Sequence, residues 1–154
     1  MMANDLQKKK EVKLQVAQKQ QRRASDPRHS VWVEASAGTG KTKVLTDRVL
    51  RLLLSGVNPA KILCLTYTKA AAVEMSDRIA KKLSFWAICD ENILYEELEK
   101  LFGVKPTQEQ MSFARRLFAK TLELLKGMRI QTIHSFCQEV LKKFPFEANI
   151  SPYF

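Results

Sequence analysis

The sequence predicts an α/β fold, in which a parallel sheet is covered by helices and an all-helical insertion separates two of the strands. Short β-branched runs alternate with amphipathic helical patterns, and a glycine-rich loop joins the first run to the first of these helices. Such alternation is typical of parallel strands joined by right-handed crossover helices. We therefore expect strands that begin at Val31, Lys61 and Arg129 to be parallel neighbours or near-neighbours in one sheet.

Residues 1–26 form a basic N-terminal leader. Its residues 5–23 are good helix formers with only scattered apolar positions, a pattern that predicts a mostly solvated helix. Pro27 disfavours helical geometry at the residue before it, so we expect the leader to end there. The run VWVEA that follows combines β-branched and aromatic residues and predicts a buried strand.

Two core segments, residues 27–83 and 127–154, flank the helical insertion of residues 84–126. Within the insertion we find no strand pattern, and we expect it to project from the sheet. The other predicted elements are, in chain order, a helix at 43–54, a strand at 61–66, helices at 70–83 and 107–125, a strand at 129–133 and a helix at 135–143.

Length and composition limit the class of protein. The 154 residues suffice for one globular domain. Apolar runs stay far below the roughly 18–20 residues of a membrane span, and the best candidate, 49–54, is interrupted by Arg51. We expect a cytoplasmic protein without a membrane partner. The net charge of +10 favours nucleic acid as a partner over a merely solvated basic surface.

A phosphate-binding loop is the clearest motif. ASAGTGKT, at residues 35–42, fits (Ala/Gly)-x-x-Gly-x-Gly-Lys-Thr between a predicted strand and a predicted helix. Backbone N–H groups of such a loop surround phosphates, its lysine reaches the β and γ phosphates, and its threonine ligates Mg²⁺. The expected nucleotide-binding residues are Ala35, Ser36, Ala37, Gly38, Thr39, Gly40, Lys41 and Thr42, of which Lys41 and Thr42 are the catalytic pair and Thr42 is the magnesium ligand.

Three motifs in order resemble those of UvrD/RecB-like superfamily 1 DNA helicases: WVEASAGTGKT, ILCLTYTKAAAVEM and IQTIHSFC. The segments ASDP and FPFEAN resemble the AddA branch of that family, the helicase-nuclease subunits of bacterial double-strand break repair. The resemblance covers about residue 18 to the end of the chain. It implies a P-loop NTPase core of the RecA-like type, the N-terminal portion of a larger motor domain, with a 1B-like helical insertion. It also implies ATP as the nucleotide and, as a partner, an AddB-like subunit.

The resemblance further implies a glutamine that reads the adenine edge, about twenty residues before Lys41. An amide suits adenine because it donates to N7 and accepts from the N6 amino group at the same time. Gln21 matches that position best, and Gln18 and Gln20 remain alternatives.

Single-stranded DNA contacts are implied by the other two motifs. In TYTKAAA the family places an aromatic ring against the bases, which makes Tyr67 the stacking residue. Stacking suits a translocating protein because every base offers a π face. Lys69-Ala70 stands where UvrD has Asn-Lys, as in AddA-like sequences. The expected DNA-binding residues are Thr66, Tyr67, Thr68 and Lys69 of this motif and Thr132 and His134 of QTIHSF.

The implied function is that of an ATP-dependent DNA helicase of double-strand break repair and recombination. A non-catalytic nucleotide- and DNA-binding module and a small P-loop kinase stay open as alternatives. Family members hydrolyse ATP with an acidic motif, and the acidic pairs Asp90-Glu91 and Glu96-Glu97 fall in the helical insertion instead. Since we find neither that motif nor a second motor domain before Phe154, we expect this chain alone to hydrolyse ATP poorly and not to unwind DNA.

Overall fold

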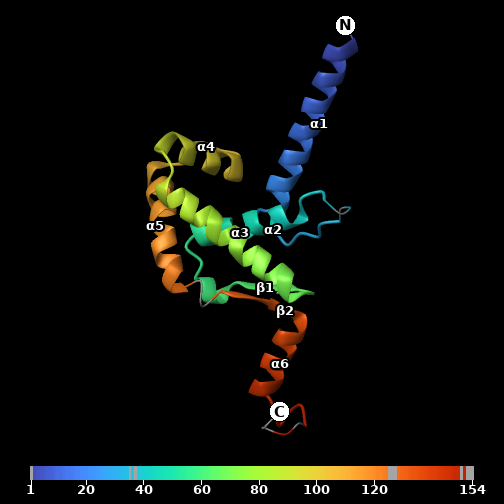
Figure 1. Ribbon diagram of the computed structural model, residues 1–154, viewed down its shortest axis with the longest axis vertical. Coiled ribbons are helices and arrows are strands. Elements are labelled where there is room, and N and C mark those ends of the chain that lie inside the picture. The colour runs from blue at the N-terminus through green and yellow to red at the C-terminus, as the bar shows by residue number, and fades with distance from the viewer. Residues whose placement is uncertain (1, 35, 37, 125–127, 150, 152–154) are drawn as a thin grey trace.

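The computed structural model, which describes residues 2–34, 36, 38–124, 128–149 and 151, consists of helices and a short parallel sheet. Figure 1 shows α1 extending from one end of the molecule and α6 lying at the other. None of the helices in the described ranges is long and apolar enough to cross a membrane. The elements are α1 (Met2–Ala24), α2 (Lys41–Leu54), the 3-10 turn η1 (Pro59–Lys61), β1 (Leu63–Thr66), α3 (Lys69–Ile88), α4 (Glu91–Phe102), α5 (Gln108–Leu124), β2 (Arg129–Thr132) and α6 (Ile133–Lys143).

The sheet consists of β1 and β2, which run parallel. Leu63 lies opposite Arg129 at its beginning, and Thr66 lies opposite Thr132 at its end. Parallel strands need a long crossover connection, and here α3, α4 and α5 provide it. The predicted α/β class and the parallel relationship of these two strands are therefore confirmed.

The predicted strand at Val31 is wrong. Residues 31–34 are in irregular structure, and their apolar side chains are exposed, Trp32 to 90%. A run of apolar β-formers becomes a strand only when a neighbouring strand pairs with its backbone. In the described part of the chain the sheet has the order β1-β2, and this segment has no place in it.

The hydrophobic core lies between α2, α3, α4 and α5. Ile79, Leu83 and Trp86 share one face of α3 at helical spacing and are completely buried. They belong to one cluster with buried leucines and other apolar residues of the other three helices. Burial of a side chain of this size contributes about 1.5–3 kcal/mol, so this face stabilises the fold strongly.

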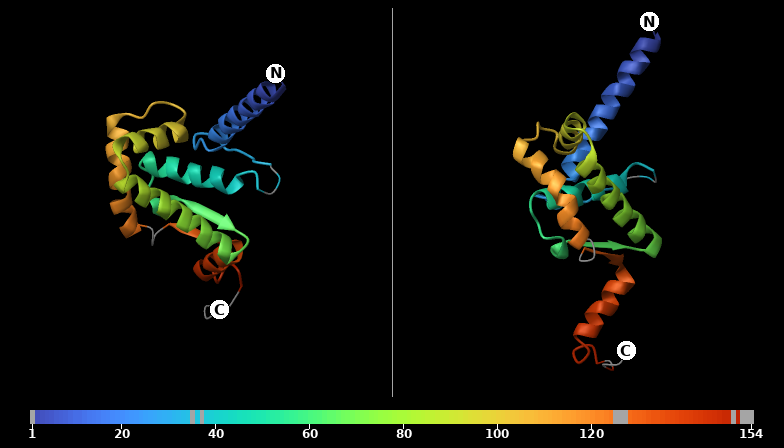
Figure 2. Two further views of the ribbon diagram at one scale, coloured as in Figure 1. Left: turned by 45° about the horizontal axis from the view of Figure 1, so that its top comes forward. Right: turned by 60° about the vertical axis from the view of Figure 1, so that its left-hand side comes forward.

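The helical segment between the two strands does not project from the sheet as expected. α3 continues to Ile88, beyond residue 84, and α4 and α5 complete the same core as α2 and α3. Figure 2 shows α5 crossing the ends of α2 and α3, with α4 lying over α2. A separate helical body would have to bury its apolar faces alone, whereas here these faces cover α2 and α3.

Candidate nucleotide and DNA sites

The glycine-rich loop has the backbone geometry that its glycines allow. Gly38 and Gly40 have φ angles of 78° and 91°, in the left-handed region where a side chain is strained. Gly40 directly precedes α2, and no side chain caps that helix. The N–H groups of a first helical turn point out of the helix, so α2 presents them to the loop. Ala35 and Ala37, also expected to bind nucleotide, lie outside the described residues.

One carbonyl group of the loop holds two of the expected nucleotide-binding side chains. The Lys41 ammonium donates a hydrogen bond to the Ser36 carbonyl oxygen at 2.7 Å, and the Thr39 hydroxyl donates to the same oxygen at 2.6 Å. Lys41 nevertheless remains exposed. Thr42 is exposed as well, and its carbonyl oxygen accepts a hydrogen bond from the Thr46 hydroxyl at 2.9 Å.

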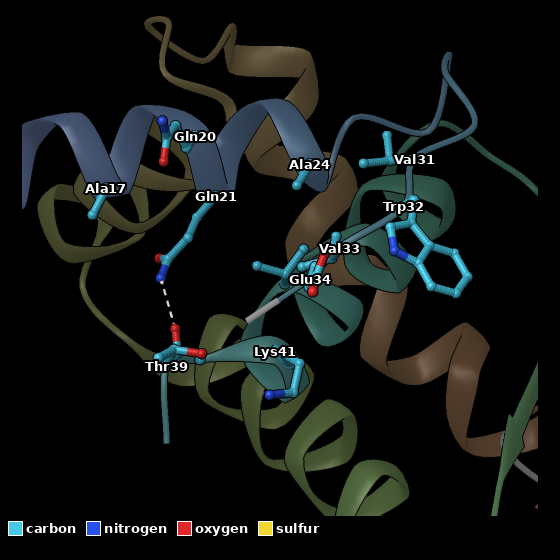
Figure 3. A pocket seen from close by; sticks show the side chains of 12 residues that line it. Ala17, Gln20, Gln21, Ala24, Val31, Trp32, Val33, Glu34, Thr39 and Lys41 are labelled. Carbon is cyan, nitrogen blue, oxygen red and sulfur yellow. Dashed lines mark hydrogen bonds between the residues drawn. The ribbon is translucent and has the colours of Figure 1, made fainter. Parts of the chain in front are cut away.

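A cavity of about 310 Å³ separates the loop from the last turns of α1. Such a volume lies at the lower end of the range for small-molecule sites. Gln21 extends from α1 toward the loop, and its Nε2 donates to the Thr39 carbonyl oxygen at 3.4 Å (Figure 3). Gln20 lines the same cavity. Of the glutamines left open by the sequence, Gln21 is therefore the one that the structure brings to the loop.

The residues around this cavity fit a nucleotide with Mg²⁺. A Cβ atom on Gly40 would lie 3.1 Å from the Gln21 amide nitrogen, so a side chain at this position would displace the amide by a few tenths of an ångström. The described residues include no group of three or more His, Cys, Asp or Glu side chains that could hold a metal ion. Mg²⁺ usually keeps several waters and binds through one or two protein oxygens and the phosphates, and the Thr42 hydroxyl can be such an oxygen.

The first expected DNA motif follows β1 at the carboxyl end of the sheet. Tyr67 is 85% exposed, and its ring is available to a ligand. Thr66 and Thr68 contribute to the turn, since the Thr66 hydroxyl donates to the Thr68 carbonyl oxygen at 2.9 Å and the Thr68 hydroxyl accepts from the Ala71 N–H at 3.1 Å. Thr68 thereby caps α3, whose exposed first residue is Lys69.

The second expected DNA motif lies beside the first one. Thr132 is 7% exposed, and its hydroxyl accepts from the Ser135 N–H at 3.1 Å, which caps α6. In the structure Thr132 therefore fixes the start of α6. A direct DNA contact by this residue stays a prediction. His134 is exposed in the first turn of α6. Because α3 and α6 both begin where the paired strands end, two positive helix termini meet at this edge.

Three carboxylates of the acidic pairs noted in the sequence form contacts within the helical segment. Glu97 of α4 forms an ion pair with Lys82 of α3, and Glu96 pairs with Lys100 one turn later in α4. Glu91 accepts a hydrogen bond from the Gln108 amide at 3.2 Å. These contacts join helices or stabilise α4, as expected for carboxylates outside a catalytic site.

Sequence reasoning missed a charged cluster between α1 and α2. In the sequence Arg51 only interrupts an apolar run. In the structure its guanidinium lies 3.7 Å from the Asp26 carboxylate, and both side chains are largely buried. Hydrogen bonds from the Arg28 side chain and backbone hold the pKa of Asp26 well below its usual range, and the charges of Arg28 and Arg51 add to the effect. The signal available in the sequence was the pair of arginines at i and i+3 of α2, Arg48 and Arg51.

Comparison with known proteins identifies the family. The model of the UvrD/REP helicase N-terminal domain matches residues 16–154. The chain belongs to the UvrD/REP helicase family. The small-kinase alternative is therefore set aside.

Relatives of the chain are bacterial ATP-dependent helicase/nuclease subunits of the AddA type. The one from Lactobacillus acidophilus is 36% identical over 140 residues, which are 91% of this chain and 10% of the relative. That of Enterococcus faecalis is 36% identical over 129 residues, 84% of this chain and 9% of the relative. That of Listeria monocytogenes is 33% identical over 129 residues, 82% of this chain and 9% of the relative. The chain thus spans about a tenth of the length of these UvrD/REP family members and is homologous to their N-terminal region.

Proposed function

We propose that this chain is the nucleotide-binding N-terminal portion of an ATP-dependent DNA helicase of double-strand break repair and recombination. The observation that carries the proposal is the phosphate loop itself, with left-handed Gly38 and Gly40, Lys41 at the start of α2, and Gln21 facing it across a cavity. Relatives named as ATP-dependent helicases support ATP as the nucleotide.

Each group at the loop has a part in binding ATP and Mg²⁺. The Lys41 ammonium, now on the Ser36 carbonyl, would neutralise the terminal phosphates, because charge-assisted hydrogen bonds to phosphate are about twice as strong as neutral ones. The Thr42 hydroxyl would hold Mg²⁺, and Ser36, Gly38, Thr39 and Gly40 supply the backbone around the phosphates, as Ala35 and Ala37 would. Bound ATP supplies the phosphoanhydride whose hydrolysis drives a motor of this family.

Single-stranded DNA would bind at the carboxyl edge of β1 and β2. Tyr67 would offer a base-stacking ring, and Thr66, Thr68, Lys69, Thr132 and His134, at or just after the ends of the paired strands, would contact the phosphate backbone. Two helix N-termini and the net charge of +10 favour a polyanion here. We expect weak binding that falls as salt rises, because few phosphates are neutralised.

The domain organisation that we propose follows the same family pattern. Residues 1–26 are the basic leader, residues 27–83 and 127–154 belong to a RecA-like motor core, and residues 84–126 are its helical insertion. Because the relatives are named as helicase/nuclease subunits, we propose a cytoplasmic location and an AddB-like partner for a larger protein of this kind. A non-catalytic nucleotide- and DNA-binding module is the alternative, and turnover of bound ATP separates the two.

Calorimetric titration with ATP and Mg²⁺ tests the proposal. Lys41→Ala removes contacts worth about 1.5–3 kcal/mol, so we expect its affinity to fall about tenfold or more. Lys43→Ala is the matched control, since Lys43 also lies in the first turn of α2 but pairs with Asp47 at 2.6 Å. Equal affinities of Lys41→Ala and the wild type would overturn the proposed site, and loss of binding in both variants would point to a folding defect of α2.

A further inference from the structure

Two arginines of α2 hold the end of α1. Arg48 donates hydrogen bonds to the carbonyl oxygens of Asp26 and His29, each at 2.7 Å. Arg51, nearly one turn further on, donates from Nη1 to the carbonyl oxygen of Arg22 at 2.8 Å and to the Ser25 hydroxyl at 3.1 Å. The last carbonyl groups of a helix have no partner within that helix. Arg51 binds one of them, and Arg48 holds the turn that follows.

The hydrogen bonds of Arg51 are partly buried, whereas the one from Arg48 to His29 is exposed. Ser25 is 1% exposed, and the Arg51 side chain is 11% exposed. The charge of Arg51 is balanced by Asp26, and its guanidinium carbon lies 5.8 Å from the centre of the Phe102 ring at the end of α4. Removing one partner of a buried charged pair is costly, so this arrangement keeps α1 in one position relative to α2.

Gln21 lies next to this contact in the chain. Gln21 directly precedes Arg22, whose carbonyl group Arg51 holds, and its amide lies on the Thr39 carbonyl of the loop. Toward its N-terminus, before this last turn, α1 runs away from the body of the molecule (Figure 1). Contacts at the end of α1 therefore set where the Gln21 amide stands relative to a nucleotide on the loop.

We propose that Arg51, together with Asp26, is a positioning residue for base recognition: by holding the Arg22 carbonyl it keeps the Gln21 amide where it can distinguish adenine from guanine. This inference rests on the proposed function. An amide that donates to N7 and accepts from N6 of adenine meets an acceptor, O6, at the second position of guanine. Selectivity needs both contacts at once, so a displacement of the amide that breaks either contact removes the discrimination.

Binding of ATP, GTP and inorganic tripolyphosphate to the 154-residue chain, each with Mg²⁺, tests the inference. Tripolyphosphate reports the phosphate loop alone, whereas the ratio of ATP to GTP affinity reports base recognition. We expect Arg51→Lys to lower that ratio about tenfold while tripolyphosphate affinity stays within about twofold, because lysine keeps the charge but lacks the forked donor. Arg78→Lys, the same change at an exposed arginine of α3, should keep the wild-type ratio.

A double-mutant cycle with Gln21→Ala separates positioning from a general structural effect. If Arg51 acts through Gln21, Arg51→Lys changes the ratio only when Gln21 is present. If the Arg51→Lys variant does not bind tripolyphosphate, the same double-mutant cycle is measured with Asp26→Asn in place of Arg51→Lys. A variant that binds tripolyphosphate and keeps the wild-type ratio overturns the inference, as does an equal effect with and without Gln21. A wild type that binds neither ATP nor tripolyphosphate overturns the proposed function instead.

Discussion

Thr66 and Thr132 are the last facing pair of the parallel ladder between β1 and β2. Each lies where its strand gives way to a helix, so the two motifs TYTK and QTIH become neighbours although a long helical segment separates them in the sequence. Crevices at the carboxyl ends of parallel strands are the usual place for ligands in open α/β sheets. The exposed ring of Tyr67 belongs to this edge.

Tyr67→Ala should weaken binding of a short single-stranded DNA. Loss of stacking on one base costs about 1–3 kcal/mol, which predicts a drop of about fivefold or more. Tyr67→Phe keeps a ring and should bind nearly as the wild type does. Fluorescence anisotropy of a labelled thymidine oligonucleotide at low salt measures both, and an alanine variant with undiminished affinity would exclude the stacking role.

Gly40→Ala should weaken nucleotide binding. A Cβ there meets the Gln21 amide at 3.1 Å, and the φ angle of 91° strains any L side chain by about 1–2 kcal/mol. Gly56→Ala is the matched control, because Gly56 has φ 82° but open space around it. Thermal unfolding should show a similar loss of stability in both variants. Titration with ATP should show weaker binding in Gly40→Ala alone. Unimpaired ATP binding by Gly40→Ala speaks against the site.

Local sequence patterns predicted most helices and the two paired strands. Apolar residues at helical spacing, such as Ile79, Leu83 and Trp86, predict a helix with one buried face whatever the rest of the fold. The strand predicted at Val31 was wrong, because a strand forms only beside a partner strand, and the local sequence does not show whether one is present. Arg51 could not be assigned a role from sequence either. Its importance comes from the way α1 meets α2, and that is a property of tertiary packing.

Stability at acid pH should depend on Asp26. Its folded-state pKa is lowered, chiefly by hydrogen bonds from Arg28, so the ionised carboxylate stabilises the fold above its ordinary pKa of about 3.9 and this contribution is lost as pH falls toward the folded value. Between about pH 5 and pH 3 the free energy of unfolding should therefore fall more steeply in the wild type than in Asp26→Asn. Urea unfolding at several pH values checks this, and parallel curves for the two proteins contradict it.

Amide NMR of the ¹⁵N-labelled chain during titration with ATP and Mg²⁺ locates the nucleotide directly. Backbone N–H groups that donate to a phosphate change their resonance strongly, and so does a side-chain amide that meets a base. We expect the largest shifts at Gly38, Gly40 and Thr42 and at the Gln21 side chain, with small changes at Tyr67. Saturable shifts that leave these loop residues untouched, or no shifts at millimolar ATP, would contradict a nucleotide site at this loop.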